Sequence, residues 1–396
     1  MPRPNPSSFA AHWDLDPSVV FLNHGSFGAC PRVVLEKQQE LQRQLEAQPV
    51  RFLYRDLEGM FDAARNELAG LVGCAADDLG LVTNATQGVN TVLRSLSLSP
   101  ADELLVTDHE YNACRNALDF VAERSGARVV VAEIPFPLRD PQQVIDSVLS
   151  CVTERTRLLL IDHVTSPTGL VLPVEPIVAA LRERGIDTLV DGAHAPGMLP
   201  LDLQSMDPAY YTGNCHKWLC TPKGSALLYV RRDLQPSIRP LSISHGANSP
   251  RTDRSRFRLE FDFTGTHDPT AVLCIPEALR FLRELMPGGL PGLRQHNHEL
   301  ALKGRQLLCD ALGCDAPAPD SMIGSLASVM LPLDPAHDPL VAIDPLQSQL
   351  WDEQRIEVPI MLWPNPPLRL LRISPQAYNS LEQYEWLAES VAKALR

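Results

Sequence analysis

Short apolar runs alternate with amphipathic stretches through the first two thirds of the chain. The short runs are apolar and contain Leu, Val and Ile, which is typical of buried strands. Between them, apolar residues recur every three or four positions, which predicts helices. Strands that alternate with helices form βαβ units, so the pattern predicts a mainly parallel sheet. The predicted strands are 102–107, 127–134, 157–164, 187–194 and 225–232, and the predicted helices are 31–49, 85–96, 111–126, 141–152 and 174–185.

The pattern changes after about Asp268. Long helical stretches are followed by two strand patterns and a last helix, which indicates a smaller α+β domain after a large α/β domain. The helices predicted here are 269–285, 292–312 and 381–395, and the strands are 325–333 and 368–374. We expect an N-terminal arm over 1–20, a large domain over 21–270 and a small domain over 271–396.

Composition and charge narrow the class of protein. A chain of 396 residues can bury the cores of two domains, and its net charge of −13 argues against a nucleic-acid partner or an anionic membrane surface. We see no signal peptide and no apolar run of transmembrane length. The nine cysteines are odd in number and scattered, and their spacing fits no usual zinc site. We therefore expect a cytoplasmic protein with buried thiols and no metal.

Polar residues directly follow the apolar runs of two predicted strands. Asp162 and His163 follow one apolar run, and Asp191 and His194 follow another. Ligands bind beyond the carboxyl ends of the strands in an open α/β sheet, so these side chains should gather at one edge, with Lys217 on a nearby loop. One interpretation is a structural ion pair. The other is a pyridoxal phosphate (PLP) site, where lysine binds the aldehyde and aspartate keeps the pyridine nitrogen protonated.

A PLP site also needs phosphate ligands. A strand-like end runs into small polar residues and then a helix, so Thr86, Gln87 and Gly88 can offer a hydroxyl and backbone N–H groups to a phosphate. An ordinary helix cap gives the same pattern. In combination with the aspartate and the lysine in this chain order, the pattern favours PLP.

Six motifs in chain order resemble those of fold-type I PLP enzymes of the class V aminotransferase group, which includes cysteine desulfurases. They are most similar to the isopenicillin N epimerase-like branch, and the resemblance spans residues 21–379. It implies a PLP transferase-like fold, with a mainly parallel seven-stranded-type sheet and helices on both faces. The motifs are FLNHGSFGACP, DHEYNA, DGAHAPG, NCHKWL, FTGTHDPTA and LRISPQAYN.

The resemblance implies roles for residues around the cofactor ring. Lys217 matches the Schiff-base lysine, Asp191 matches the partner of the pyridine nitrogen, and His194 matches the residue near the ring hydroxyl. Tyr111 falls where the group stacks an aromatic side chain on the cofactor, although a core tyrosine would fit the pattern too. Ser166 stands where relatives often carry an asparagine, which is a departure from the family pattern.

Other matches concern the phosphate and the substrate. Thr86 and His216 match phosphate ligands, with Gln87 beside them. Thr266 matches a residue that reaches the phosphate of the neighbouring subunit, which implies a homodimer with composite active sites.

Arg372 matches the arginine that holds the substrate carboxylate, a task that suits a planar guanidinium. Asn23 and His24 are expected to line the substrate pocket. A surface arginine that ends a strand and a structural histidine are the alternatives for Arg372 and His24.

The fate of a Cα carbanion decides the reaction. Cysteine desulfurases carry a nucleophilic cysteine shortly before this arginine, whereas residues 356–374 contain none, which disfavours a persulfide route. The apolar side chains Met361, Leu362 and Trp363 either wall the substrate site or pack in the core. We expect epimerisation or racemisation of an amino acid or a derived compound, with C–S β-lysis of a cysteine conjugate or sulfoxide, or transamination, as alternatives.

Epimerisation needs a second acid or base, because Lys217 serves one face of the carbanion only. His24 and Tyr111 are the candidates. Two functions outside this class are disfavoured. No G-x-G-x-x-G follows the first strand, which argues against a nucleotide-binding oxidoreductase, and intact Lys217, Asp191 and Arg372 argue against a non-catalytic regulatory module.

Overall fold

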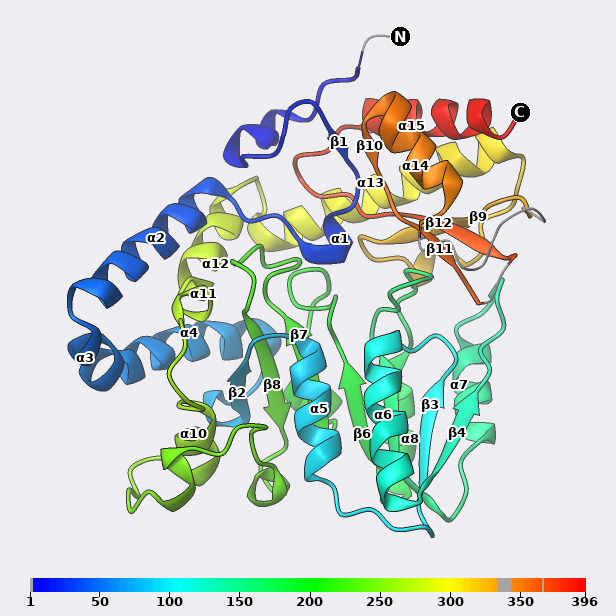
Figure 1. Ribbon diagram of the computed structural model, residues 1–396. Coiled ribbons are helices and arrows are strands. Elements are labelled where there is room, and N and C mark those ends of the chain that lie inside the picture. The colour runs from blue at the N-terminus through cyan, green and yellow to red at the C-terminus, as the bar shows by residue number, and fades with distance from the viewer. Residues whose placement is uncertain (1–2, 334–342, 365–366) are drawn as a thin grey trace.

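The computed structural model describes residues 3–333, 343–364 and 367–396 (Figure 1). A seven-stranded sheet lies at its centre, in the order β2-β8-β7-β6-β5-β3-β4. Within this sheet β8 runs antiparallel to both neighbours, and the other strands share one direction. The predicted mainly parallel, seven-stranded sheet is therefore confirmed. Its strands are β2 (Leu79–Val82), β3 (Glu103–Thr107), β4 (Arg128–Ala132), β5 (Thr156–Asp162), β6 (Asp187–Asp191), β7 (Tyr210–Asn214) and β8 (Ala226–Val230).

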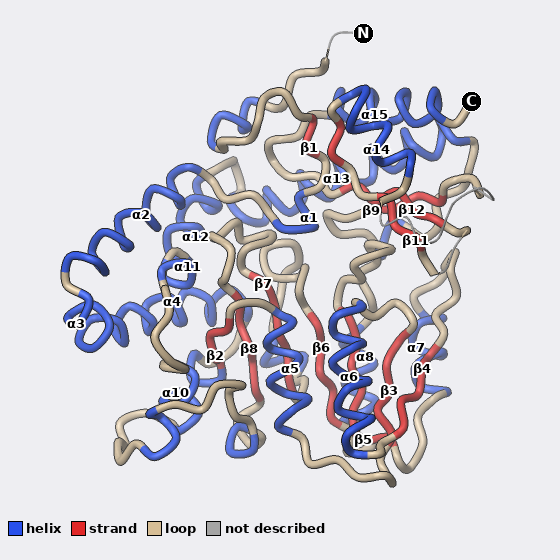
Figure 2. Tube along the Cα trace, viewed as in Figure 1, coloured by secondary structure: helices blue, strands red, loops and turns tan. Residues whose placement is uncertain are grey.

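Helices cover both faces of this sheet, as the red strands and blue helices of Figure 2 show. Alternate strand residues enter two separate cores, so that Leu104 packs with α5 and α6 while Leu105 packs with α7 and α8. Burial on both faces explains why the strands are nearly all apolar. The helices on the first face are α5 (Ala85–Ser95), α6 (Asn112–Ser125) and α10 (Arg256–Phe261), and those in the second core are α2 (Arg32–Ala47), α4 (Leu57–Val72), α7 (Gln142–Ser150), α8 (Val174–Glu183) and α12 (Ile275–Glu284).

Two differences from the predicted elements have physical causes. The helix predicted over 269–285 is broken into α11 (Thr270–Leu273) and α12 at Cys274, because Pro276 lacks an N–H and fits only the first turn of a new helix. Strand β7 was not predicted, since its sequence, YYTGN, ends in glycine and asparagine. It nevertheless lies between β6 and β8, and its residues are buried.

The small domain contains an antiparallel sheet in the order β11-β12-β9, packed on long helices. The N-terminal segment joins this domain, because β1 pairs in parallel with β10. Helix α12, in contrast, packs in the core of the large domain. The division into 1–20, 21–270 and 271–396 remains a prediction. The elements are β1 (Val20–Phe21), β9 (Ala327–Met330), β10 (Ile356–Glu357), β11 (Ile360–Leu362), β12 (Arg369–Ile373), α13 (Gly289–Leu312), α14 (Pro345–Gln354) and α15 (Leu381–Ala394).

The N-terminal arm is held by an aromatic cluster. The ring of Trp13 lies 5.6 Å from that of Phe281 and 5.2 Å from that of Tyr378, both in edge-to-face geometry. Its indole N–H donates to the carbonyl of Ala29 over 3.2 Å. The arm thereby joins α12 to the turn after β12.

The remaining short helices are α1 (His24–Phe27), α3 (Pro49–Arg51) and α9 (Leu203–Met206), with single turns or π-helical turns at Ser8–His12, Phe52–Asp56, Ala76–Asp78, Gln235–Ser237, His245–Asn248 and Asp320–Met322.

Among the described residues, no helix combines the length and apolar character needed to cross a membrane.

Replacement by alanine should have opposite effects on stability at Gly28 and at Gly70. Gly28 has a φ of +69°, and a Cβ there would lie 2.0 Å from the carbonyl oxygen of His216, so Gly28→Ala should destabilise the protein by about 2 kcal/mol or more. Gly70 is in α4, where a Cβ would meet nothing within 4 Å, so Gly70→Ala should stabilise it by up to about 1 kcal/mol. Urea unfolding measures both, and an unchanged Gly28→Ala would refute the close contact.

Candidate active site

Three carboxyl groups meet at the carboxyl ends of β3, β5 and β6. Asp162 ends β5, Asp191 ends β6, and the two residues are partners in the sheet register. Glu110 comes from the loop between β3 and α6. All three side chains are buried. The sequence-based expectation that Asp162 and Asp191 share one edge of the sheet is thus confirmed, because parallel strands place their ends side by side.

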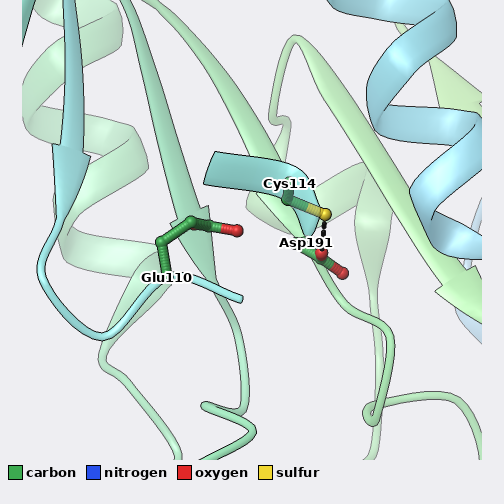
Figure 3. A group of neighbouring side chains, drawn as sticks. All are labelled: Glu110, Cys114 and Asp191. Atoms are coloured by element: carbon green, nitrogen blue, oxygen red, sulfur yellow. Dashed lines mark hydrogen bonds between the residues drawn. The ribbon is translucent and has the colours of Figure 1, made fainter. Parts of the chain in front are cut away.

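Asp191 is the carboxylate with the most donors of the three. Its Oδ1 accepts from the backbone N–H of Ala193 over 2.9 Å, and its Oδ2 accepts from the thiol of Cys114 over 3.0 Å (Figure 3). Burial raises the pKa of Asp191, while these two hydrogen bonds and the positive charge of Lys217 act in the opposite direction. The hydrogen bonds therefore favour the charged form of Asp191.

Glu110 and Asp162 are in a different state. Both oxygens of Glu110 and Oδ2 of Asp162 are buried without a hydrogen-bond partner among the described residues. Burial, followed by the charges of neighbouring carboxylates, raises the pKa of Glu110 and of Asp162 well above the ordinary range. The negative charge of the cluster is therefore concentrated on Asp191.

Lys217 lies on the loop after β7, with its amine beside His194. The distance from Lys217 Nζ to His194 Nε2 is 3.0 Å, and the Trp218 indole N–H points at His194 Nδ1 from 3.5 Å. Nδ1 is thus the accepting nitrogen, and a neutral ring then carries its proton on Nε2, which can donate to the lysine amine only when that amine is neutral. Burial, and next the positive charge of Arg372, lower the pKa of Lys217 to about 8. About half of the amine is therefore neutral near pH 8, and most of it above that pH.

The N-terminus of α5 has the features of a phosphate site. Asn84 caps the helix by accepting from the Gln87 N–H over 2.8 Å, and Asn214 Oδ1 accepts from the Ala85 N–H over 2.9 Å. The amide and hydroxyl of Thr86 have no hydrogen-bond partner in the described part of the chain. Gly88 brings the helix close to β7, since a Cβ there would lie 2.2 Å from Thr212 Oγ. Thr86 is free to bind an anion.

The other predicted phosphate residues lie in two places. His216 Nδ1 donates to the Ser225 carbonyl over 3.2 Å, which leaves Nε2 available. Burial, and next Lys217, lower the pKa of His216 to about 4. Gln87 instead lines a pocket of about 500 Å³ together with Thr266 and Lys223. Thr266 is exposed in this pocket.

Arg372 is a buried guanidinium without a carboxylate partner among the described residues. It donates to the carbonyl of Ser166 over 2.5 Å, to the Ser166 hydroxyl over 3.2 Å, and to Ser26 over 3.1 Å. Its Nε has no partner in the described structure, and Asn23 Oδ1 lies 3.5 Å from Nη2. Burial lowers the pKa of Arg372 to about 10. The interpretation of Arg372 as a surface residue is wrong, and Ser166 contacts this arginine.

His24 is engaged on both ring nitrogens. Nε2 lies 3.0 Å from the carbonyl oxygen of Lys217, and Nδ1 lies 2.8 Å from the hydroxyl of Tyr378. A carbonyl can only accept, so Nε2 carries the proton and Nδ1 accepts from the tyrosine. Burial lowers the pKa of His24 to about 3, which keeps the ring neutral. His24 thus holds the backbone of Lys217 in place.

Tyr111 differs from His24 in being accessible. It precedes the first turn of α6, and its side chain is 44% exposed. Asn23 faces Arg372 and accepts from Ser26 over 2.6 Å.

The described part of the apolar stretch 359–367 packs against loops of the large sheet through Trp363. The ring of Trp363 lies 4.4 Å from that of His109 and 5.1 Å from that of Phe136. Met361 and Leu362 are half-buried in β11, while residues 365–366 lie outside the described residues. Trp363 therefore joins the small domain to the loops after β3 and β4.

Several residues of the site were missed at the level of sequence. Cys114 and Ser26 contact the predicted site residues Asp191 and Arg372, Asn214 accepts from the Ala85 N–H beside Thr86, and Tyr378 holds His24. A usable signal was present for two of them, since Asn214 directly precedes the Cys-His-Lys motif and Ser26 lies inside the HGSFG loop. The other contacts join segments that are far apart in the chain.

A partly neutral lysine, a buried aspartate and an open helix N-terminus fit the aldehyde, the pyridine nitrogen and the phosphate of PLP. The unpartnered Thr86 amide and hydroxyl and the well-supported Asp191 carboxylate are the observations that match the cofactor. The fold and the site thus define a PLP-dependent enzyme of fold type I.

Comparisons with known proteins agree. The family model "Aminotransferase class-V" matches residues 20–339, and the chain belongs to this family. It is 36% identical to isopenicillin N epimerase of Streptomyces clavuligerus over 95% of both chains. A probable chloroplastic L-cysteine desulfhydrase of Arabidopsis thaliana is 29% identical over 98% of this chain and 85% of its own. Two structures of the C–S lyase C-DES share the fold, and each covers 94% of this chain. The first has a TM-score of 0.77 and 22% identity over 97% of its own chain. The second, with glycine linked to its PLP cofactor, has a TM-score of 0.76 and 23% identity over 96% of its own chain.

Uptake of PLP by the cofactor-free protein should depend on pH with a midpoint near the Lys217 pKa of about 8. Only the neutral amine attacks an aldehyde, so the rate should rise with pH through this value and then level off. Arg372→Leu removes a charge that lowers the pKa of Lys217, so its midpoint should move to higher pH. Stopped-flow absorbance measures both profiles. Borohydride reduction and peptide mapping should then find the label on Lys217, and a label on Lys223 would refute the assignment.

Proposed function

We propose that the enzyme inverts the configuration at the α-carbon of an amino acid or an amino-acid-derived compound. The observation that carries the proposal is Arg372, a buried guanidinium that no carboxylate neutralises among the described residues. A buried charge of this kind is costly until an anion binds, and a substrate carboxylate supplies it. The similarity to isopenicillin N epimerases over nearly the whole chain supports this choice of reaction.

The cofactor and three residues have different roles in this reaction. Bound PLP supplies an electron sink that stabilises negative charge at the substrate α-carbon. Arg372 holds the carboxylate and fixes its orientation, and Lys217 moves the α-proton on its own face. The lowered pKa of Lys217 suits it to this role, because a general base works best near the ambient pH. His24 keeps the lysine backbone in place through its 3.0 Å contact.

Inversion requires a second group on the opposite face, and we assign this role to Tyr111. His24 is disfavoured because both of its ring nitrogens are occupied by Tyr378 and by the Lys217 carbonyl. Tyr111 is 44% exposed, and no hydrogen bond occupies its hydroxyl among the described residues. A phenol is able to donate and to accept a proton.

C–S β-lysis is the second candidate, because the chain also resembles proteins named L-cysteine desulfhydrase and hercynylcysteine sulfoxide lyase. This reaction needs the same first proton transfer by Lys217 and the same carboxylate contact to Arg372. It differs in what leaves the β-carbon and needs no second base on the opposite face. A persulfide route remains disfavoured by the absence of cysteine in residues 356–374.

The two reactions are separated by one experiment in deuterated buffer. Holoenzyme is incubated with a panel of L-amino acids and thioethers, while chirality, deuterium at Cα, pyruvate and keto acids are measured together. Epimerisation predicts deuterium incorporation with inversion, and Tyr111→Phe should slow inversion much more than exchange by Lys217. Exchange with full retention, together with release of pyruvate and a thiol, would establish lysis in its place.

Arg372→Lys should weaken substrate binding and slow the chemistry. An ammonium cannot reproduce the two parallel hydrogen bonds of a guanidinium, and loss of this contact should cost roughly 2–5 kcal/mol. Steady-state kinetics should show a higher KM and a lower kcat, while the absorbance spectrum of bound cofactor stays unchanged. Wild-type KM in Arg372→Lys would contradict the role of this arginine.

We also propose a homodimer in the cytoplasm. Thr266 is exposed beside Gln87 and Lys223 in a pocket of about 500 Å³, where a residue of a second copy can complete each phosphate site. Large apolar side chains are exposed at Phe27 (74%) and Tyr54 (87%), which suits a covered surface. All nine cysteines lie in the described residues and are free thiols, which fits a reducing compartment.

Thr266→Ala should weaken the retention of PLP without unfolding the chain, because the threonine is exposed and makes no side-chain hydrogen bond to the described residues. Sedimentation at micromolar concentration should find a dimer for the wild type. Thr252→Ala, the same change at an exposed threonine outside this pocket, provides the control. A monomer that retains PLP and full activity would overturn the composite site.

A further inference from the structure

Glu110 and Cys114 lie beside Asp191 at the N-terminal end of α6 (Figure 3). The ligand-type atoms of all three residues lie within 4.8 Å of one another, and all three side chains are buried. We propose that Glu110 and Cys114 are positioning residues that fix the orientation and the negative charge of Asp191, and through it the protonation of the PLP ring nitrogen. The proposal rests on the PLP site and is independent of which reaction the enzyme catalyses.

The contact of Cys114 is directional. Cys114 lies in the first turn of α6, where its backbone N–H donates to the Tyr111 carbonyl over 2.9 Å. The thiol then lies 3.0 Å from Asp191 Oδ2, and Cys114 is fully buried. Burial and the adjacent Asp191 charge raise the pKa of Cys114 well above its ordinary range, so the thiol stays protonated and remains the donor. With the Ala193 N–H on Oδ1, both oxygens of Asp191 are held.

Glu110 supplies the second part of the arrangement. Its carboxyl group is buried, neither oxygen has a partner among the described residues, and it faces Asp162, Asp191, Cys114 and, at longer range, Arg115. An ionised Glu110 would repel the neighbouring carboxylates, whereas a neutral carboxyl adds an O–H donor beside Asp191. Glu110 can therefore support the Asp191 charge only while it is itself uncharged.

The same three residues could also be interpreted as metal ligands. A metal would require the thiolate of Cys114 and would occupy Asp191, the carboxylate that the PLP ring nitrogen needs. The two interpretations differ in a measurable way, because metal binding predicts stoichiometric metal in the purified protein.

Cys114 is tested by substitution with and without a donor. Cys114→Ala removes the hydrogen bond to Asp191, and PLP should dissociate roughly tenfold more readily, the loss expected for a hydrogen bond to a charged group. Cys114→Ser keeps a donor and should restore most of the affinity. Cys309→Ala, at a buried cysteine in the core of the small domain, is the matched control and should bind PLP as the wild type does.

A second readout follows the ring nitrogen itself. In holoenzyme reconstituted with nitrogen-15 PLP, Cys114→Ala should shift the ring-nitrogen resonance toward the unprotonated value, since an Asp191 with fewer donors draws the shared proton to itself. A merely structural role of Cys114 would lower the melting temperature and leave this resonance unchanged.

Glu110 is tested by the same two measurements. Glu110→Gln is neutral and keeps a donor, so affinity and resonance should stay close to wild type, whereas Glu110→Leu should resemble Cys114→Ala. The proposal is overturned if Cys114→Ala and Glu110→Leu both bind PLP within twofold of wild type with unchanged resonances. It is also overturned if the wild-type protein contains one equivalent of zinc that Cys114→Ala lacks.

Discussion

Charge held away from water is the constraint on which the site depends. An isolated ion in a protein interior is expensive, so each buried charge needs donors, acceptors or an opposite charge nearby. In this protein Asp191 is supported by Ala193 and Cys114, while Arg372 is supported by serine and asparagine oxygens. Burial, and next the charge of Arg372, lower the pKa of Lys217. The polar residues around the edge of the sheet are thus explained by the charges that they support.

The fold brings these groups close to one another because parallel strands end at the same edge of the sheet. Asp162 and Asp191 are partners in adjacent strands, so a register set by apolar residues also sets the position of the carboxylates. The sequence allowed this edge to be predicted, since an apolar run followed by a polar residue is a local signal. Motif resemblance added Lys217 and Arg372, whose positions depend on loops that a local pattern does not define. Comparison with the class V family then supported the cofactor.

Contacts between segments that are far apart in the chain could not be predicted from the sequence. The hydrogen bond of Cys114 to Asp191 joins residues 77 positions apart, and that of His24 to the Lys217 carbonyl joins residues 193 positions apart. Neither residue type indicates such a contact in the sequence, because a lone cysteine in a helix is usually a core residue. Strand β7 was missed for a related reason, since its burial comes from the strands on either side and not from an apolar sequence of its own.

The pairing of β1 with β10 has a consequence for the order in which the protein can assemble. Asn23 contacts Glu357, which is 334 positions later in the chain, and also faces Arg372. A ribosome adding about 5–20 residues per second needs roughly 20–70 s to cover that distance. During this time the large sheet can form, while β1 lacks its partner strand β10. The contacts that join Asn23 to Glu357 and Arg372 are therefore among the last that the chain can make, after the carboxyl groups at the edge of the large sheet can already have come together.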